Sequence, residues 1–407
     1  MNQIFDSRVE YAVKNIWQTP ADGNGAEAMR KLMEAAEEGD GDACYFLARC
    51  YFGSYFVDPV LGFEDNDELG EQYLQKSLEL GSAVGMLGAL RVGGFEPKDG
   101  RYVYPPYNSL VEVWKEVEKK AKAGQGFCQF MLGAACYYGD APYIFGVEER
   151  LWEKAMVQYR KEAIAWLDKS IANGYERGIG MMVSIYSEGE YGIPENEQQR
   201  NRYIQIGADK KLGRFEYMLA DLYEENGEIG KAKELYERAI EHCEYDAYFK
   251  LGRFYTFDGA LQRNLVKAKE YFELALDKGE EKAGCWNRLG EIYFYGGDGI
   301  PVDYDKAFSY LRNARSKNDW CSDMLGTCYL KGLGTPVDYT AARNEFEIYE
   351  SECLSCIGLG EIYAYGLGVE QNIKLGIQYF KQFPDHPRVI ENMRHFKKTL
   401  FGWKQID

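Results

Sequence analysis

One short pattern recurs along this 407-residue chain and constrains its fold more than any other feature. Nine times an apolar residue is followed by a second residue that is usually Gly or Ala, at spacings of 40, 45, 50, 37, 32, 38, 36 and 34 residues. These anchors are Leu47-Ala48, Leu87-Gly88, Leu132-Gly133, Met182-Val183, Leu219-Ala220, Leu251-Gly252, Leu289-Gly290, Leu325-Gly326 and Leu359-Gly360. Four residues after the first anchor residue, seven of the nine units have Tyr. Since Tyr is only 33 of 407 residues, the chain is built from repeats.

Each anchor predicts a helix, which we call helix A. Four residues make about one helical turn, so the Leu and the Tyr share a face, while the Gly or Ala between them lets another helix approach closely. A Gly follows each anchor by six to eight residues and suits the end of a helix.

A second periodic segment, helix B, follows each helix A. It is clearest at Lys267 to Phe272 and Lys306 to Leu311, where a small residue precedes apolar residues by three and four positions. Asp303 and Asp338 are expected to lie at the N-caps of two of these helices. One helical hairpin cannot bury both its faces, so the units are expected to stack into an all-α, right-handed α-solenoid (superhelix) of about nine hairpins.

The repeat residues resemble the Sel1-like repeats, which are longer relatives of the tetratricopeptide repeats. The clearest units read LGEIYFYGGDGIPVDYDKA from Leu289 and LGTCYLKGLGTPVD from Leu325, close to the family pattern LG-x-x-Y-x-x-G-x-G-V-x-x-D-x-x-KA. The resemblance covers about residues 26–383 and is strongest in the last units. The unit Leu219 to Cys243 lacks the extended loop between its helices and looks more like a plain tetratricopeptide repeat.

Four segments are predicted along the chain. Residues 1–25 form a leading helix from about Phe5 to Trp17, 26–210 hold divergent repeats with insertions, 211–383 hold regular repeats, and 384–407 form a basic C-terminal capping helix. The cap is predicted because Ile390, Met393, Phe396 and Leu400 have helical spacing.

The resemblance implies a protein–protein interaction scaffold or adaptor with no enzymatic activity and no cofactor. In tetratricopeptide-like stacking, helix A lines the concave face, and residues two before, two after and five to six after the anchor point into it. This rule predicts the following partner-binding residues: Tyr45, Arg49, Phe52, Phe130, Tyr137, Tyr138, Tyr217, Asp221, Glu224, Arg253, Phe257, Asn287, Glu291, Phe294, Tyr295, Asp323, Thr327, Glu361 and Tyr365.

Aromatic and acidic residues dominate this set, which favours a basic or amphipathic peptide or protein as the partner. The alternative for the rings is that they fill a narrow superhelix against one another. A second functional hypothesis is a regulatory or inhibitory protein that caps a folded partner, as an immunity protein or antagonist does, or that switches curvature when it binds a ligand.

Three insertions, at residues 54–65, 95–108 and 140–152, lie where the turn between helices A and B should be. They are expected to cluster on one edge of the solenoid and to wall one end of the groove, or else to pack only on its flank.

The net charge further limits the kinds of partner that the chain is expected to bind. The chain carries −17 at pH 7, which excludes a broad nucleic-acid surface. No membrane segment or export signal is recognised, so the protein is predicted to be cytoplasmic. The tail from Lys381 onward carries about +3, so the chain is expected to be a monomer or a weak homodimer in which this tail meets the acidic body of a second copy.

The cysteines and histidines of the sequence predict no disulfide bond, no metal site and no catalytic site. The ten cysteines are expected to be reduced, because pairs such as Cys44/Cys50 lie too far apart along one helix. His242 is next to Cys243, but no orienting group or oxyanion site is evident, and His386 and His395 do not share a helical face.

Overall fold

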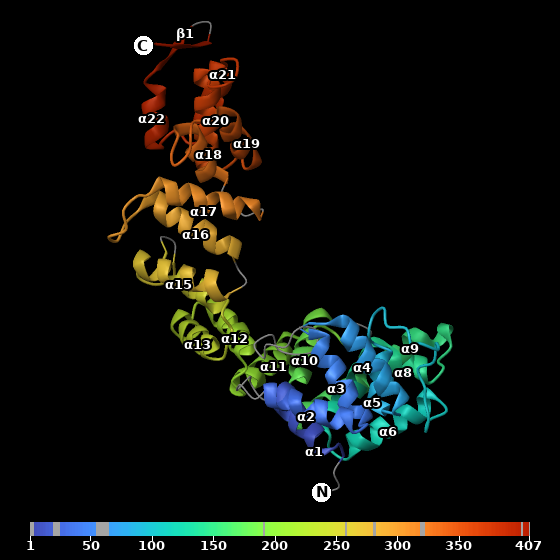
Figure 1. The fold of residues 1–407 in the computed structure, drawn as a ribbon. Helices are drawn as coiled ribbons and strands as arrows, with labels where there is room; N and C mark the ends of the chain where they lie inside the picture. Colours follow the sequence, from blue (N-terminus) through green and yellow to red (C-terminus); the bar gives the residue numbers. More distant parts are fainter. Residues whose placement is uncertain are drawn as a thin grey trace. The chain divides into compact units, whose positions relative to one another are not determined.

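The structure, a computed structural model, describes residues 4–18, 25–53, 65–189, 192–256, 259–279, 282–317, 322–399 and 402–406. The chain divides into two compact units, Met1–Leu219 and Ala220–Asp407. Both units are helical, and within the second unit the hairpins follow one another in chain order (Figure 1).

All nine anchors lie on helices, as predicted. These A helices are α3 (Gly41–Tyr51), α5 (Ala83–Ala89), α7 (Gly126–Tyr138), α10 (Arg177–Glu188), α12 (Gly213–Glu225), α14 (Ala247–Phe254), α16 (Lys282–Tyr295), α18 (Ser322–Lys331) and α20 (Cys353–Tyr365). The B helices are α4 (Asp67–Glu79), α6 (Leu110–Lys122), α9 (Trp152–Ala172), α11 (Glu197–Asp209), α13 (Ile229–Glu241), α15 (Leu265–Lys278), α17 (Tyr304–Ser316), α19 (Tyr339–Ile348) and α21 (Ile373–Phe380). The predicted all-α solenoid of nine helical hairpins is therefore confirmed.

In the described parts of the chain, four further α-helices lie outside the nine hairpins. They are α1 (Ser7–Val13), α2 (Gly25–Glu37), α8 (Asp140–Ile144) and α22 (Pro387–Met393). The predicted leading helix is found, but its second half is a π-helix, Lys14–Gln18. A short 3₁₀-helix, Glu149–Leu151, precedes α9.

At several anchor glycines helices A and B cross closely. A Cβ added at Gly326 would lie 2.6 Å from the Phe346 ring of α19, and one at Gly360 would lie 2.5 Å from the Phe380 ring of α21. At Gly290 the neighbour is Leu311, at 2.7 Å. These positions exclude any side chain because the B helix occupies the space.

The repeat tyrosine joins the two helices of a hairpin by its ring and its backbone. Tyr293 of α16 stacks on Tyr310 of α17 with ring centroids 5.9 Å apart and planes 5° apart. Its carbonyl accepts the N–H of Asp303 at 2.9 Å, and the Asp303 carboxylate accepts the N–H of Lys306 at 3.0 Å. Asp303 is thus the predicted N-cap, and Asp338 caps α19 in the same way.

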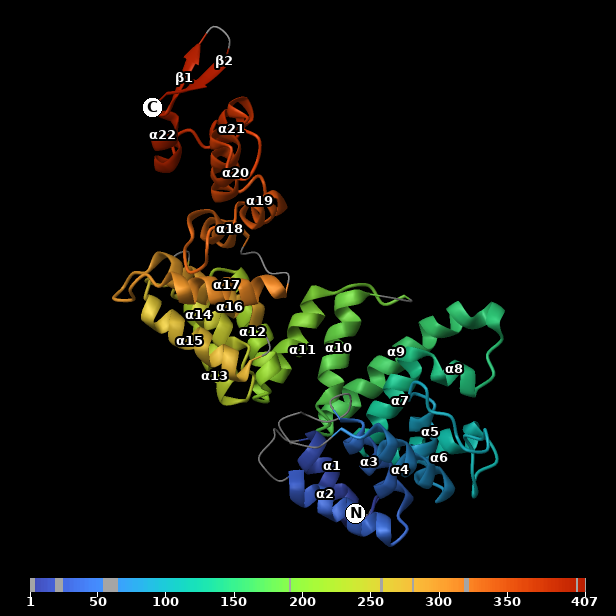
Figure 2. The same ribbon diagram turned by 45° about the horizontal axis from the view of Figure 1, so that its top comes forward.

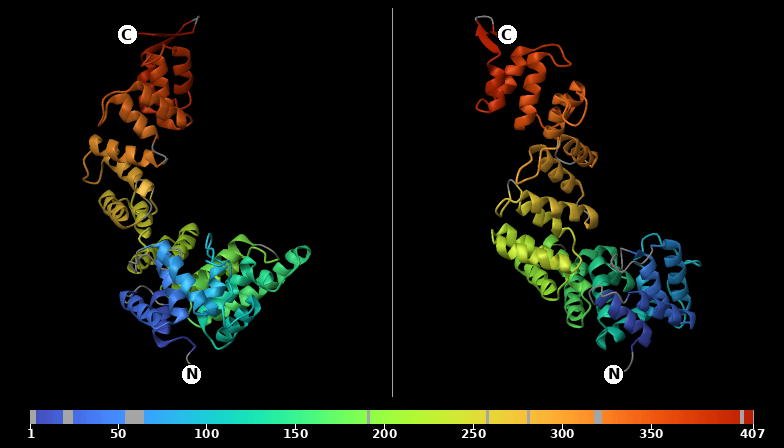
Figure 3. Two further views of the ribbon diagram at one scale, coloured as in Figure 1. Left: turned by 45° about the vertical axis from the view of Figure 1, so that its right-hand side comes forward. Right: turned by 60° about the vertical axis from the view of Figure 1, so that its left-hand side comes forward.

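Consecutive hairpins bury a continuous core. In the second unit, α15 packs on α16, α17 on α18 and α19 on α20, and Figures 2 and 3 show this succession from other sides. Fully buried Phe272 and Phe346 contribute to the interior. Each hairpin is therefore stabilised by its neighbours, as expected of repeat proteins.

The C-terminus differs from the prediction. The helix ends at Met393, and the chain continues as an antiparallel hairpin of β1 (Phe396–Thr399) and β2 (Gly402–Gln405). Helix α22 packs on α20 and α21, so it caps the last repeat over a shorter length than expected. Phe396 is buried beside Val389 and Phe380, which shows that the apolar spacing reflected packing of a helix followed by a strand.

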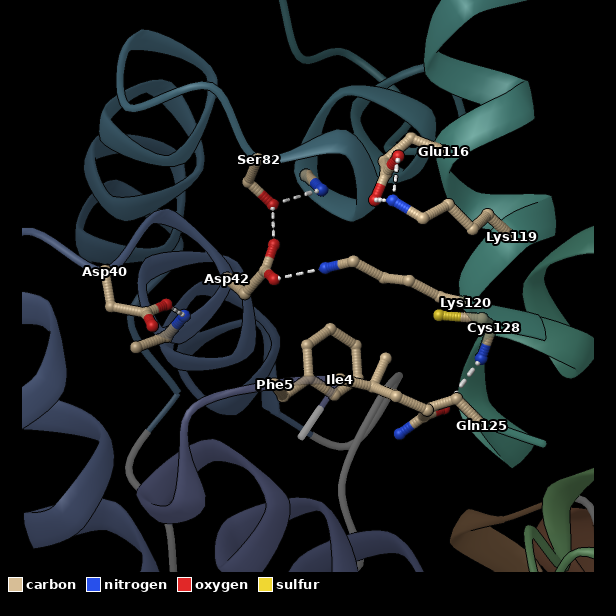
Figure 4. A network of polar contacts seen from close by, with 12 residues as sticks. Ile4, Phe5, Asp40, Asp42, Ser82, Glu116, Lys119, Lys120, Gln125 and Cys128 are labelled. Carbon is tan, nitrogen blue, oxygen red and sulfur yellow. Dashed lines mark hydrogen bonds and ion pairs between the residues drawn. The ribbon is translucent and has the colours of Figure 1, made fainter. Parts of the chain in front are cut away.

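A polar network ties the first repeats together in the first unit (Figure 4). Asp42, near the start of α3, accepts the Ser82 hydroxyl at 2.6 Å and the Lys120 ammonium of α6 at 2.7 Å. The Lys120 ammonium also lies 4.4 Å from the centroid of the Phe5 ring. Segments 78 residues apart are joined here by one carboxylate.

Within the ranges that the structure describes, no helix combines the length and the apolar character that crossing a membrane requires.

Candidate binding surface on the A helices

In the first unit, most of the predicted partner-binding residues are buried. Tyr45, Arg49, Phe52 and Tyr137 are all buried, and Phe130 is half-buried against Tyr175, at 5.1 Å between ring centroids. These residues do not line an open groove, so this part of the prediction is corrected.

Aromatic packing is the reason for this burial. The Arg49 guanidinium lies 5.1 Å from the Phe127 ring centroid and 5.7 Å from that of Trp17. Phe46 packs on Phe127 at 4.8 Å. Rings from neighbouring repeats therefore fill the interior against one another, which is the alternative that the sequence left open.

Tyr138 is the exposed member of the set in the first unit, at 62%. The Arg91 guanidinium lies 4.6 Å from its ring centroid, and Arg91 also pairs with Asp140 at 3.4 Å. Arg91 occupies the position where most repeats have their tyrosine, so the departure of the second repeat from the pattern has a structural role.

At the start of the second unit, the predicted carboxylates are already paired. Asp221 accepts the Lys250 ammonium at 2.7 Å, and Glu224 lies 3.8 Å from both Lys250 and Arg253. The Tyr236 hydroxyl lies within hydrogen-bond distance of both the Asp221 and the Glu224 carboxylates, and its single proton can be donated to either. Tyr217, on the same helix, is half-buried. Phe257 lies outside the described residues.

At the other end of the second unit, Glu361 is only 3% exposed. It accepts hydrogen bonds from Arg388 at 2.6 and 2.9 Å, from Lys331 at 2.5 Å and from Asn392 at 2.9 Å. Burial raises the pKa of Glu361, but Arg388 and Lys331 outweigh that effect and hold the pKa below its usual value. Its neighbour Tyr365 lies against His395 and Phe396 of the tail.

Between these two ends lies a group of predicted residues on α16 and α18, which we call the central patch: Asn287, Glu291, Phe294, Tyr295, Asp323 and Thr327. Tyr295 is 50% exposed, and Phe294 meets it edge-on at 5.0 Å between ring centroids. Glu291 pairs with Arg288 at 2.9 Å. Asn287 is half-buried, and Thr327 is buried, its hydroxyl donating to a backbone carbonyl of its own helix.

Asp323 differs from the other carboxylates. Its side chain accepts the backbone N–H of Met324 at 2.7 Å, and no Lys or Arg of the described chain lies within ion-pair distance of it. Burial raises its pKa, and the charge of Glu352 adds to this effect. Partial burial and the carboxylates of Asp323 and Glu291 raise the pKa of Tyr295 to about 12. The central patch therefore combines a half-exposed ring with one carboxylate, Asp323, that no described cation pairs with.

The sequence rule missed the basic residues on the same faces. Lys331 lies six residues after its anchor, within the range that the rule covers, and Lys250 lies one residue before its anchor. These two lysines could therefore have been found in the sequence from their positions relative to the anchors. Arg388 and Asn392 come from the tail, and no repeat position identifies them.

The insertions pack on the flank where they are described. Tyr104 is buried and accepts a hydrogen bond from Gln75 of α4 at 3.2 Å. In the third insertion, Phe145 meets Trp114 of α6 at 5.5 Å between ring centroids. Most of the first insertion, residues 54–64, lies outside the described residues, so a shared wall formed by all three stays a prediction.

Among the residues that the structure describes, no three His, Cys, Asp or Glu side chains gather as a metal site would require. The nine described cysteines are free thiols, as expected, and Cys321 lies outside the described residues. His386 caps α22, its ring nitrogen accepting the Arg388 N–H at 3.2 Å.

The stacked hairpins and their A-helix surface define an α-solenoid repeat protein, a class whose members are typically non-catalytic scaffolds for protein–protein interaction. The sequence model of the Sel1 repeat matches residues 41–82, 214–242, 246–280, 287–319, 323–344 and 354–383. These six segments of the chain are therefore Sel1 repeats. The match over 214–242 includes most of the unit that looked more like a plain tetratricopeptide repeat.

One solved structure supports this fold. The chain is similar to c5321, a protective antigen of uropathogenic Escherichia coli with the same repeat fold, at a TM-score of 0.53 and 20% identity over 95% of this chain and 78% of that one. A Sel1 repeat protein from Oxalobacter formigenes gives a TM-score of 0.46 and 16% identity over 89% of this chain and 97% of that one. The first likeness supports the fold alone. No protein with curated information gives a sequence match.

Proposed function

We propose that this protein is a non-catalytic adaptor whose central patch binds a peptide or protein segment that carries basic residues. The observation that supports the proposal is that the central patch holds a half-exposed tyrosine, Tyr295, and a carboxylate, Asp323, with no described Lys or Arg within ion-pair distance.

Two other predicted carboxylates of the A helices are paired within the chain, Asp221 with Lys250, and Glu361 with Lys331 and Arg388. Tyr295 keeps half its surface exposed, and Asp323 on the next A helix has no cation within ion-pair distance among the described residues. A basic side chain from a partner would supply the missing charge and cover the ring.

Affinity capture from the native lysate tests this proposal. Wild-type protein is compared with a Tyr295→Ala, Asp323→Asn double variant, and bound proteins are eluted first at low and then at high salt. We expect the variant to lose a partner that wild type releases at high salt, because the contact is electrostatic and partly exposed.

Tyr143→Ala is the matched control, since Tyr143 is exposed to 63% on α8, away from the central patch in sequence and in the first unit. Retention of every partner by the double variant would contradict the assignment of the surface. A folded partner held through a salt-insensitive interface by both proteins would instead favour the regulatory or inhibitory function.

A further inference from the structure

The C-terminal hairpin of β1 and β2 (Figure 2) has two different faces. Phe396 and Trp403 pack against the core of the last repeat, and the Lys381 ammonium lies 6.0 Å from the Trp403 ring centroid, so theirs is the inner face. Because side chains alternate along a strand, the residues next to them point the other way. Lys397 and Lys404 lie on this outer face, and both are exposed.

The register of the two strands places these lysines directly opposite each other. Lys397 pairs with Lys404, next to the pair of Phe396 and Gln405. Side chains that face each other in this way have Cβ atoms about 4.5–5.5 Å apart, and like charges there destabilise a sheet. In the described part of the chain, no Asp or Glu lies within ion-pair distance of either ammonium group. The fold therefore holds two positive charges together without a carboxylate between them.

Protection of the strands from aggregation does not account for this pair. Exposed strands often carry lysine, because its charge discourages pairing with another strand. Lysines in staggered positions would serve that purpose without the repulsion of a facing pair. A facing pair suits an anion instead, because a carboxylate between two ammonium groups relieves their repulsion and forms a charge-assisted hydrogen bond with each.

The hairpin is already held in place by the chain. The Ile406 N–H donates to the His395 carbonyl at 2.8 Å, and the Gln371 amide donates to the Gln405 side chain at 2.9 Å. The two lysines are therefore positioned before any ligand binds.

The charge of the whole chain limits which anion can approach. The chain carries −17, so a second copy, a nucleic acid or an anionic membrane would bring a large negative charge close to it and be repelled. A short acidic segment brings less charge. At an ionic strength of about 0.15 M, charges more than about 8 Å away are largely screened, and such a segment responds mainly to the lysines beside it.

We infer that the outer face of the hairpin binds a short acidic segment of a partner protein, with a carboxylate held between Lys397 and Lys404. This site goes beyond the proposed function and does not depend on it, because the central patch is proposed to bind a basic segment. An adaptor with both sites would hold two segments of opposite charge.

Fluorescence anisotropy with labelled (Asp-Ala)6 tests the site, with the full-length chain titrated in at about 0.15 M salt. We expect the Lys397→Ala, Lys404→Ala double variant to bind about five- to tenfold more weakly, because each exposed ion pair contributes modestly. Lys397→Arg with Lys404→Arg should keep the affinity of wild type. The matched control is Lys154→Ala with Lys161→Ala, which removes the same charge from α9, where both lysines are exposed.

Lys397→Glu separates loss of the ligand from loss of the hairpin. It places opposite charges across the two strands, so its melting temperature should equal or exceed that of wild type while peptide binding disappears. Unchanged affinity in the Lys397→Ala, Lys404→Ala variant, or equal weakening by the α9 control, overturns the site.

Two further results would also overturn the acidic segment as the ligand. The first is a dimer of wild type, seen by sedimentation, that the Lys397→Ala, Lys404→Ala variant does not form, which would assign the face to a second copy. The second is binding to vesicles of phosphatidylcholine and phosphatidylserine without binding to the peptide, which would assign it to a membrane.

Discussion

Single residues in this protein matter mainly through what fills the space beside them. The anchor glycines show this clearly, because a side chain added at such a glycine would collide with a side chain of the facing helix. Gly326 faces Phe346, whereas Gly230, also in a helix, has no atom within 4 Å of its missing Cβ. Two chemically identical substitutions are therefore expected to have opposite effects.

Gly326→Ala should lower the free energy of unfolding by about 1–3 kcal/mol, because overpacking forces the Phe346 ring to move. Gly230→Ala should raise it by about 0.5–1 kcal/mol, since alanine favours a helix and meets nothing there. Urea denaturation of both variants measures the difference. Equal effects of the same sign would show that the crossing at Gly326 is looser than the structure indicates.

At the scale of elements, the last repeat depends on one buried carboxylate. Glu361 connects α18, α20 and α22 through Lys331 and Arg388. The short helix α22 has few other polar ties to the solenoid, so this cluster and the apolar contacts of Val389 and Phe396 hold the cap in place.

Glu361→Gln should lower the free energy of unfolding of the second unit by about 2 kcal/mol at pH 7. Breaking a fully buried ion pair costs about 3–5 kcal/mol, and the cost here is smaller because both basic partners are partly exposed. The pKa of Glu361 is lowered in the folded state, so its stabilisation is present above the unfolded pKa of about 4.3 and disappears as the pH falls through the lower, folded value. The gap in stability between wild type and variant should therefore narrow below about pH 4.3. Denaturation at pH 7 and pH 3.5 measures it, and a constant gap would contradict the ionised cluster.

At the scale of the whole molecule, the chain is two compact units within one repeat array. In such arrays the contacts between neighbouring repeats contribute much of the free energy of unfolding. A local defect is expected to spread only to the adjacent hairpins before it reaches the rest of the chain.

Hydrogen exchange followed by mass spectrometry should show this confinement. Glu361→Gln is expected to speed amide exchange in α18 to α22 and to leave α3 to α9 unchanged. Uniformly faster exchange over both units would mean that the array unfolds as one cooperative block.

The repeat itself could be predicted from the sequence because its signals are local. The anchor, the tyrosine four residues later and the N-cap Asp303 lie within one hairpin, so their spacing is fixed by helix geometry alone. The tail was predicted less well. The spacing of Ile390, Met393 and Phe396 fits a longer helix, but the structure ends the helix at Met393, leaves Ile390 exposed and buries Val389 and Phe396 against the last repeat.

By itself, the sequence determined that this protein is a stack of nine helical hairpins, and it predicted a concave face rich in acidic and aromatic residues. Only the tertiary structure decided which of those residues stay accessible. Tyr45 and Arg49 are buried by rings from other repeats, and Glu361 is neutralised by Arg388, 27 residues away. The physical reason is that exposure and charge balance depend on side chains from segments distant in sequence, which no local spacing specifies.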